Sequence, residues 1–255
     1  MISRFLSNMH EGTYTCPVHG DVKSMYILDE SGEKHWCECP ECTRDRECNE
    51  RTLRDKVALE RLKQKWKESN IKEKFYSMTF DDYITSNDSQ VKAKDAIIKI
   101  ANGESDRSVL LLGGNGLGKT MLASLAIKKR GGAIYKMYEI VMRIKASYSS
   151  IATESEFAIL KQLSGLPVLA IDEIGRQFGS ESERNWLSYV IDERYEDNRP
   201  TILISNLKLM RDCSEEEKTG GLYIEKYLGK DSVSRLVECA DIITIQGSDW
   251  RRKQV

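Results

Sequence analysis

The stretch VLLLGGNGLGKT, residues 109–120, decides the fold of this chain. Its apolar start is typical of a buried strand, and the glycine-rich run after it fits the pattern G-x-x-x-x-G-K-[ST]. The residues of that pattern are Gly113, Gly114, Asn115, Gly116, Leu117, Gly118, Lys119 and Thr120. Small residues let backbone N–H groups face phosphate oxygens, and a following helix adds its positive end. The stretch therefore predicts an ATP-binding loop, with Lys119 on the β- and γ-phosphates and Thr120 on Mg²⁺.

Outward from this loop, short apolar strands alternate with helices. Strands are expected near residues 108–112, 133–137, 168–171, 201–205 and 242–245. Helices are expected over residues 90–101, 120–129, 138–148, 155–163 and 181–197. Because apolar strands interleaved with helices form parallel sheets covered on both faces, the pattern predicts an α/β domain.

An acidic pair follows the predicted strand 168–171, at the sheet edge where open α/β folds bind their ligands. Asp172 is placed to orient Mg²⁺, and Glu173 is placed to act as general base toward a water molecule. Asn206 follows the strand 201–205, so its amide is expected beside this pair, where it can hold the attacking water or the γ-phosphate. An ordinary Asx turn is the alternative for Asn206.

Two arginines near the C-terminus are candidates for further phosphate contacts. Arg235, in DSVSRL (231–236), could reach across a subunit boundary to a nucleotide held by a neighbour. Arg251, in SDWR (248–251), could contact the nucleotide of its own subunit. A solvated surface charge is the alternative for each.

Candidate metal ligands lie near the N-terminus and are Cys16, His19, Cys39 and Cys42. Their pattern, C-x₂-H followed by C-x₂-C, suits a tetrahedral zinc site. An acidic segment with few apolar residues needs such a staple to fold, so we predict a small, structural, zinc-ribbon-like module. Cys37 is an alternative to Cys39, and His35 and Cys48 are outside candidates.

Charge changes sign near residue 50 in a chain of 255 residues whose net charge is −1. Residues 1–50 hold 10 acidic and 5 basic side chains, whereas residues 51–75 hold 9 basic and 4 acidic ones. We therefore expect a zinc-binding module over 1–50, a basic linker helix over 51–75 and an ATPase domain over 76–255. A helix of about residues 49–69 fits a light connecting element better than a dedicated nucleic-acid arm.

Membrane and secreted classes are disfavoured. The longest apolar runs, 109–112 and 167–171, are too short to cross a bilayer, and the first twenty residues lack a secretory signal. Seven cysteines without an export signal favour reduced thiols or metal ligands. We expect a cytoplasmic protein with no membrane partner.

Taken in order, these motifs resemble the DnaC/DnaI type of bacterial and phage helicase loader, within the AAA+ ATPases. The matching stretches are NIKEKFYSMTFDDY (70–83), GGNGLGKT (113–120), VLAIDEIG (168–175), RPTILISNL (199–207), DSVSRL (231–236) and SDWR (248–251). Lys72 departs from the pattern, because many members have proline there. The resemblance implies an AAA+ fold with a five-stranded sheet, in which Asn206 is the sensor-1 residue, Arg235 the arginine finger and Arg251 the sensor-2 arginine.

The resemblance also implies ATP hydrolysis and a set of partners. The zinc module would dock on a hexameric replicative helicase, and the ATPase domain would form nucleotide-dependent homo-oligomers on single-stranded DNA. In the family a helical insertion lines the DNA path. By position, the candidates here are Arg143, Lys145, Ser147 and Tyr148.

Two other functions compete with that of a helicase loader. An IstB-like transposition helper ATPase acting on duplex DNA has nearly the same core motifs, but such helpers generally lack a zinc module. A metabolic P-loop kinase would need an acceptor pocket and an arginine-bearing lid, whereas Asp172, Glu173 and Asn206 favour hydrolysis by water. The sequence therefore favours a helicase loader.

Overall fold

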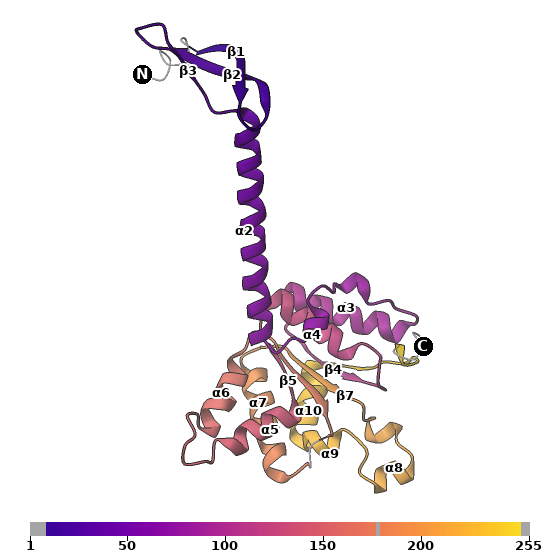
Figure 1. Cartoon of the computed structure of the whole chain (residues 1–255). Helices are drawn as coiled ribbons and strands as arrows, with labels where there is room; N and C mark the ends of the chain where they lie inside the picture. Colours follow the sequence, from indigo (N-terminus) through magenta and orange to yellow (C-terminus); the bar gives the residue numbers. More distant parts are fainter. Residues whose placement is uncertain (1–8, 177–178, 251–255) are drawn as a thin grey trace. The chain divides into compact units, whose positions relative to one another are not determined.

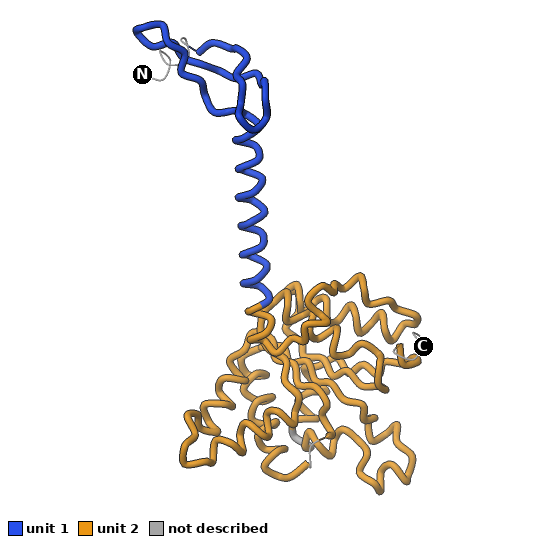
Figure 2. Tube along the Cα trace, viewed as in Figure 1, with its two compact units in different colours: residues 1–63 blue, residues 64–255 orange. Residues whose placement is uncertain are grey.

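The computed structural model describes residues 9–176 and 179–250, and it separates the chain into two compact units, residues 1–63 and 64–255 (Figure 2). The boundary falls inside helix α2 (Pro40–Glu68). The expected boundary at residue 50 lies within the same helix.

The first unit is a small antiparallel sheet whose strands are β1 (Met9–Cys16), β2 (Gly20–Leu28) and β3 (Lys34–Trp36), in that order (Figure 1). Its apolar packing consists largely of aromatic rings: the Trp36 centroid lies 5.6 Å from that of Tyr14 and 4.8 Å from that of Tyr26. All three rings remain partly exposed. So thin a core agrees with the expectation that a metal staples this module.

Helix α2 begins at Pro40 rather than near residue 49 as expected. Proline at the first helical position loses no hydrogen bond, and Glu41 in the first turn complements the positive helix end. None of the helix's residues is buried. At its far end the Trp66 ring packs on Tyr76, with centroids 5.2 Å apart. The earlier start places Cys42 in the first turn of the helix.

The second unit contains a five-stranded parallel sheet in the order β5-β6-β7-β4-β8, which confirms the predicted α/β fold. Its strands are β4 (Ser108–Leu112), β5 (Ala133–Lys136), β6 (Leu169–Ile174), β7 (Thr201–Ser205) and β8 (Ala240–Thr244). Strand β7 lies between β4 and β6, so the phosphate loop and the acidic pair follow strands that are not neighbours.

Helices cover both faces of this sheet. On β4, Leu110 and Leu112 belong to one hydrophobic core, whereas Val109 and Leu111 belong to the other. The first core includes residues of α5, α6, α7, α9 and α10, and the second includes residues of α3 and α4. The helix bounds are α3 (Asp88–Asn102), α4 (Lys119–Arg130), α5 (Met137–Ala146), α6 (Glu156–Gly165), α7 (Glu181–Glu196), α8 (Glu215–Thr219), α9 (Glu225–Leu228) and α10 (Lys230–Cys239).

Candidate nucleotide site and metal centre

A cavity of about 610 Å³ opens where β4, β6 and β7 end. Several predicted site residues line it: Asn115, Gly116, Leu117, Gly118, Lys119, Thr120, Asp172, Glu173 and Asn206. Gly113 and Gly114 are not among the lining residues, but their carbonyl oxygens accept hydrogen bonds from Lys119, which lines the cavity. Three motifs that are distant in sequence therefore meet at one sheet edge, as the strand pattern predicts.

The loop needs glycine where other parts of the chain approach it. Gly118 has a left-handed φ of 75°, and a Cβ there would lie 2.5 Å from the ring of Tyr83. Tyr83 is buried and donates a hydrogen bond to the carbonyl of Leu117 at 3.1 Å. Burial raises the pKa of Tyr83 to about 12, so its hydroxyl remains a donor at neutral pH. Gly116 likewise has no room for a side chain, because it faces Asp249.

Lys119 is folded onto its own loop. Its ammonium donates to the carbonyl oxygens of Gly113 at 2.7 Å and Gly114 at 2.6 Å, and to Oδ1 of Asn206 at 3.0 Å. The Asn206 amide in turn donates to Oδ1 of Asn115 at 2.8 Å. The structure therefore joins the phosphate-loop lysine and the amide that follows β7 in one hydrogen-bond network.

Thr120 and Asp172 also meet. The Thr120 hydroxyl donates to Oδ2 of Asp172 at 2.7 Å, and Asp172 is 8% exposed. A hydroxyl and a carboxylate are hard oxygen ligands of the kind that Mg²⁺ takes beside nucleotide phosphates. The residues present therefore fit a magnesium ion, with Thr120 and Asp172 as the groups that would hold it or its water.

Glu173 stands in an irregular part of β6. The register with β7 shifts between Ile171 and Ile174, and Glu173 has a left-handed φ of 58°. Such bulges re-aim side chains beside functional sites. The carboxylate pairs with Lys136 at 3.0 Å and with Arg176 at 3.3 Å. Its side chain is 25% exposed, which leaves it accessible to water.

The two arginines expected near phosphate groups differ in position. Arg235 lies on α10, does not line the nucleotide cavity and forms an ion pair with Asp192 of α7. The predicted role of Arg235 toward the nucleotide of a neighbouring subunit therefore stays a prediction. Arg251 lies outside the described residues. Just before it, Trp250 lines the cavity, and its backbone N–H donates to the carbonyl of Gly116 at 3.3 Å.

Residues from the segment 74–84 form the rest of the cavity wall. They were not predicted from the sequence as site residues. Phe75, Met78 and Ile84 give it an apolar wall. Lys128 of α4 holds this segment, because its ammonium donates to the carbonyl oxygens of Phe75 at 3.0 Å and of Tyr76 and Met78 at 2.7 Å. Burial lowers the pKa of Lys128. In the sequence, this segment stood out only through the resemblance of residues 70–83 to helicase loaders. It contains no spaced motif that would mark it as part of a nucleotide site.

The expected DNA-contacting residues near α5 are largely engaged within the chain. The Arg143 Nη2 donates to Oε1 of Glu154 at 2.7 Å and also to Gln162. The Tyr148 hydroxyl bonds to Glu156, and the Ser147 hydroxyl donates to the carbonyl of Ile144 at 2.7 Å. Lys145 is exposed.

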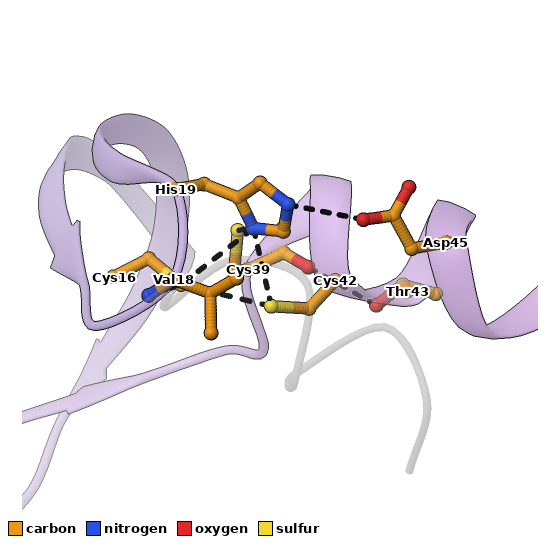
Figure 3. A network of polar contacts seen from close by, with 7 residues as sticks. All are labelled: Cys16, Val18, His19, Cys39, Cys42, Thr43 and Asp45. Carbon is orange, nitrogen blue, oxygen red and sulfur yellow. Dashed lines mark hydrogen bonds and ion pairs between the residues drawn. The ribbon is translucent and has the colours of Figure 1, made fainter.

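The predicted metal ligands gather at one point of the first unit, as Figure 3 shows. Their four donor atoms lie within 4.8 Å of one another and belong to Cys16, His19, Cys39 and Cys42. Cys16 and His19 come from the β1–β2 hairpin, whereas Cys39 and Cys42 flank the start of α2. Of the alternatives, Cys37 and Cys48 lie outside this group, and His35 instead bonds Asp29 at 2.8 Å.

The spacing of these atoms fits tetrahedral zinc. The distances from His19 Nδ1 to the sulfurs of Cys16, Cys39 and Cys42 are 3.8, 3.7 and 3.4 Å, and the Cys16 and Cys42 sulfurs are 3.6 Å apart. Zinc bonds of about 2.3 Å to sulfur and 2.0–2.1 Å to nitrogen require roughly 3.5–3.8 Å between ligands. Four protein donors complete the tetrahedron, which is typical of a structural site.

Neighbouring groups contact two of these four residues, His19 and Cys16. Oδ2 of Asp45 lies 3.0 Å from Nε2 of His19 (Figure 3), so a proton on Nε2 would leave the Nδ1 lone pair free for a metal held by the three cysteines. Backbone N–H groups of His19 and Val18 lower the pKa of the Cys16 thiol to about 6, which favours the thiolate.

Comparison with known families identifies an ATP-binding family that covers most of the chain. A model of the family described as IstB-like ATP binding protein matches residues 44–255, most of the chain. The chain belongs to this family. Membership makes this IstB-like protein an ATP-binding AAA+ protein and confirms the predicted fold.

Curated relatives of this IstB-like protein are named replicative helicase loader DnaC. The protein from Buchnera aphidicola subsp. Acyrthosiphon pisum is 30% identical over 54% of this chain and 59% of its own length. The Escherichia coli K12 protein is 31% identical over 39% of this chain and 42% of its own length. The chain thus matches about three fifths or less of these two relatives.

Solved structures agree. A crystal structure of the DnaC helicase loader is 26% identical, has a TM-score of 0.54 and covers 69% of this chain and all of its own. A DnaI structure has a TM-score of 0.52 at 19% identity over 69% of this chain and 94% of its own, which supports the fold. The resemblance to DnaC/DnaI-type loaders is therefore confirmed.

Among the described residues, no helix is both long and apolar enough to span a bilayer.

Proposed function

We propose that this chain is an ATP-dependent loader that binds a hexameric replicative helicase and single-stranded DNA during initiation of DNA replication. The observation that carries the proposal is a Cys₃His group able to hold a metal ion, ahead of an ATP-binding unit that resembles DnaC loaders. In this proposal residues 1–50 dock on the helicase, residues 51–75 link, and residues 76–255 bind ATP and assemble with other copies.

The residues of the nucleotide cavity support ATP hydrolysis as the proposed reaction. Lys119 exchanges its carbonyl partners for the β- and γ-phosphates, while Asn206 remains beside the γ-phosphate. Bound magnesium would supply positive charge to the phosphates. Glu173 accepts a proton from water as the water oxygen bonds to the γ-phosphorus and the bond to the ADP oxygen breaks. Arg235 does not line the nucleotide cavity of its own subunit, so in this proposal it acts on the nucleotide of a neighbouring subunit.

The proposal can be tested by light scattering on gel-filtered mixtures of this protein and the host's hexameric helicase with ATP. We expect a joint peak heavier than the hexamer. The double variant Cys39→Ser/Cys42→Ser should lose that peak, whereas Cys48→Ser, which changes a cysteine outside the metal cluster, should keep it. Absence of a joint peak with metal and nucleotide bound would contradict helicase loading.

A transposition helper is the second candidate, because the matching family takes its name from IstB. Such a protein would assemble with ATP on duplex DNA. Electron microscopy of the protein with ATP and either duplex or single-stranded DNA separates the two. Filaments on duplex DNA alone would favour the transposition helper.

A further inference from the structure

A second cavity, of about 400 Å³, adjoins the nucleotide site and has no role in the mechanism above. It shares Thr120 and Asp172 with the nucleotide cavity, but its other walls come from the end of α2, from β5 and from α5. Its charged side chains are Lys67, Lys72, Lys136, Arg143, Glu139 and Asp172. Its volume lies in the range of small-ligand sites.

The charges around this cavity favour an anion. Both of its carboxylates are already engaged: Asp172 accepts from Thr120 at 2.7 Å, and Glu139 accepts from the backbone N–H of Lys136 at 3.0 Å. Lys67 and Lys72 are exposed, and neither side chain has an ion pair or hydrogen bond within the described part of the chain. Two uncommitted ammonium groups therefore face one cavity.

The end of α2 holds these lysines in place. The helix closes with Asn70 at a left-handed φ of 58°, where its N–H bonds the carbonyl of Lys67 and the Ile71 N–H bonds that of Trp66, each at 3.0 Å. This is the Schellman arrangement, sealed here by buried Ile71. The Ser69 carbonyl also accepts from the N–H of Ile134 in β5 at 3.0 Å. Lys67 and Lys72 thus stand on either side of a turn fixed to the sheet edge.

Helix stability explains the positive charge of Lys67 but not that of Lys72. A cation in the last turn complements the negative helix end, so Lys67 has a structural reason to be basic. Lys72 lies beyond the helix and has no such reason. Tyr135 of β5 also lines the cavity, and its partly exposed ring offers a face for stacking.

We infer that this cavity binds the phosphate backbone of a single nucleic-acid strand, with Lys67 and Lys72 as its phosphate contacts and Tyr135 as a stacking surface. The inference rests on the proposed function, because it says where that function's single strand is held. The end of the basic run 51–75 thereby acquires a role besides linking.

The test is fluorescence anisotropy of a labelled oligo-dT strand with the full chain and a non-hydrolysable ATP analogue, at several salt concentrations. Each phosphate contact to a single strand adds about 0.7 to the negative slope of log K against log salt. Lys67→Gln/Lys72→Gln should lower that slope by about 1.4 and weaken binding at least about tenfold, while affinity for the analogue stays unchanged.

Lys56→Gln/Lys65→Gln is the matched control, because it removes the same charge from exposed positions on α2 that do not line the cavity. An equal loss of strand affinity in both double variants would mean that the whole basic run attracts the strand. That result would overturn the proposed site. No loss in either variant, or no binding by the unaltered chain, would overturn it as well. Helicase association is measured separately, so loading through the zinc module can stand if this site fails.

Calorimetry with inorganic pyrophosphate, in the presence of saturating analogue, separates a strand from a free phosphate ligand. Weak or no pyrophosphate binding together with the lysine-dependent strand affinity supports the inference. Tight pyrophosphate binding that requires Lys67 and Lys72, with strand affinity unchanged in the double variant, would show that the cavity serves a free phosphate compound instead.

Discussion

Lys119 donates a hydrogen bond to Oδ1 of Asn206 at 3.0 Å, although the two residues are 87 positions apart. The contact links the end of β7 to the phosphate loop after the neighbouring strand β4. A γ-phosphate arriving at Lys119 therefore also meets the Asn206 amide. This relationship makes Asn206 a candidate sensor of the bound phosphate.

Replacing Asn206 with alanine should slow hydrolysis more than it weakens ATP binding. The amide would act chiefly as charge develops on the transferring phosphate, so we expect kcat to fall about 10²-fold. Phosphate release and binding of a fluorescent ATP analogue measure the two effects. Asn102→Ala, at an exposed position on α3, serves as control. A loss confined to binding would contradict the assigned role.

The acidic pair should divide into two functions. Glu173→Gln should bind ATP with normal magnesium dependence and hydrolyse it about 10²- to 10⁴-fold more slowly, because the general base is lost. Asp172→Asn should instead raise the magnesium concentration needed for nucleotide binding. Titration of each variant with MgCl₂ during a binding assay separates them. Identical behaviour of the two variants would refute the division.

Metal content distinguishes the cysteines. Cys39→Ser should lose zinc, because its thiolate is one of four donors, and the first unit should then lose its sheet. Cys37→Ser should retain about one zinc per chain as a matched change two residues away. Elemental analysis gives the zinc content, and circular dichroism the loss of structure. ATP binding should survive in both variants, since the nucleotide cavity lies wholly in the second unit.

Arg235 should act between subunits. Arg235→Ala should reduce hydrolysis about 10³-fold or more in the assembled state, the range typical of an arginine finger. Arg211→Ala, which alters another exposed arginine of the second unit, should leave it unchanged. Mixing Arg235→Ala with Lys119→Ala subunits should restore part of the activity, because one supplies the nucleotide site and the other the arginine. No recovery on mixing would place the effect of Arg235 within its own subunit.

Local patterns in the sequence were enough to predict the parallel sheet, the position of the glycine-rich loop at its edge, and the grouping of Cys16, His19, Cys39 and Cys42. Apolar strands and their ends are short-range features, so the placement of Asp172 and Asn206 at one edge follows once the strands are parallel. Ligand spacing likewise pointed to Cys39 before Cys37. These predictions needed no knowledge of which distant side chains touch.

Tertiary structure alone decided the rest, because those contacts join residues with no shared pattern. Tyr83 closing over Gly118, and Lys128 holding the wall that contains Phe75, depend on how one segment crosses α4. The start of α2 at Pro40, well before the expected start near residue 49, likewise appears only in the structure. Lys67 and Lys72 lie around one cavity because the turn between them is held by Ile71, which is buried beside β5. Such a contact between distant segments cannot be predicted from amino-acid composition.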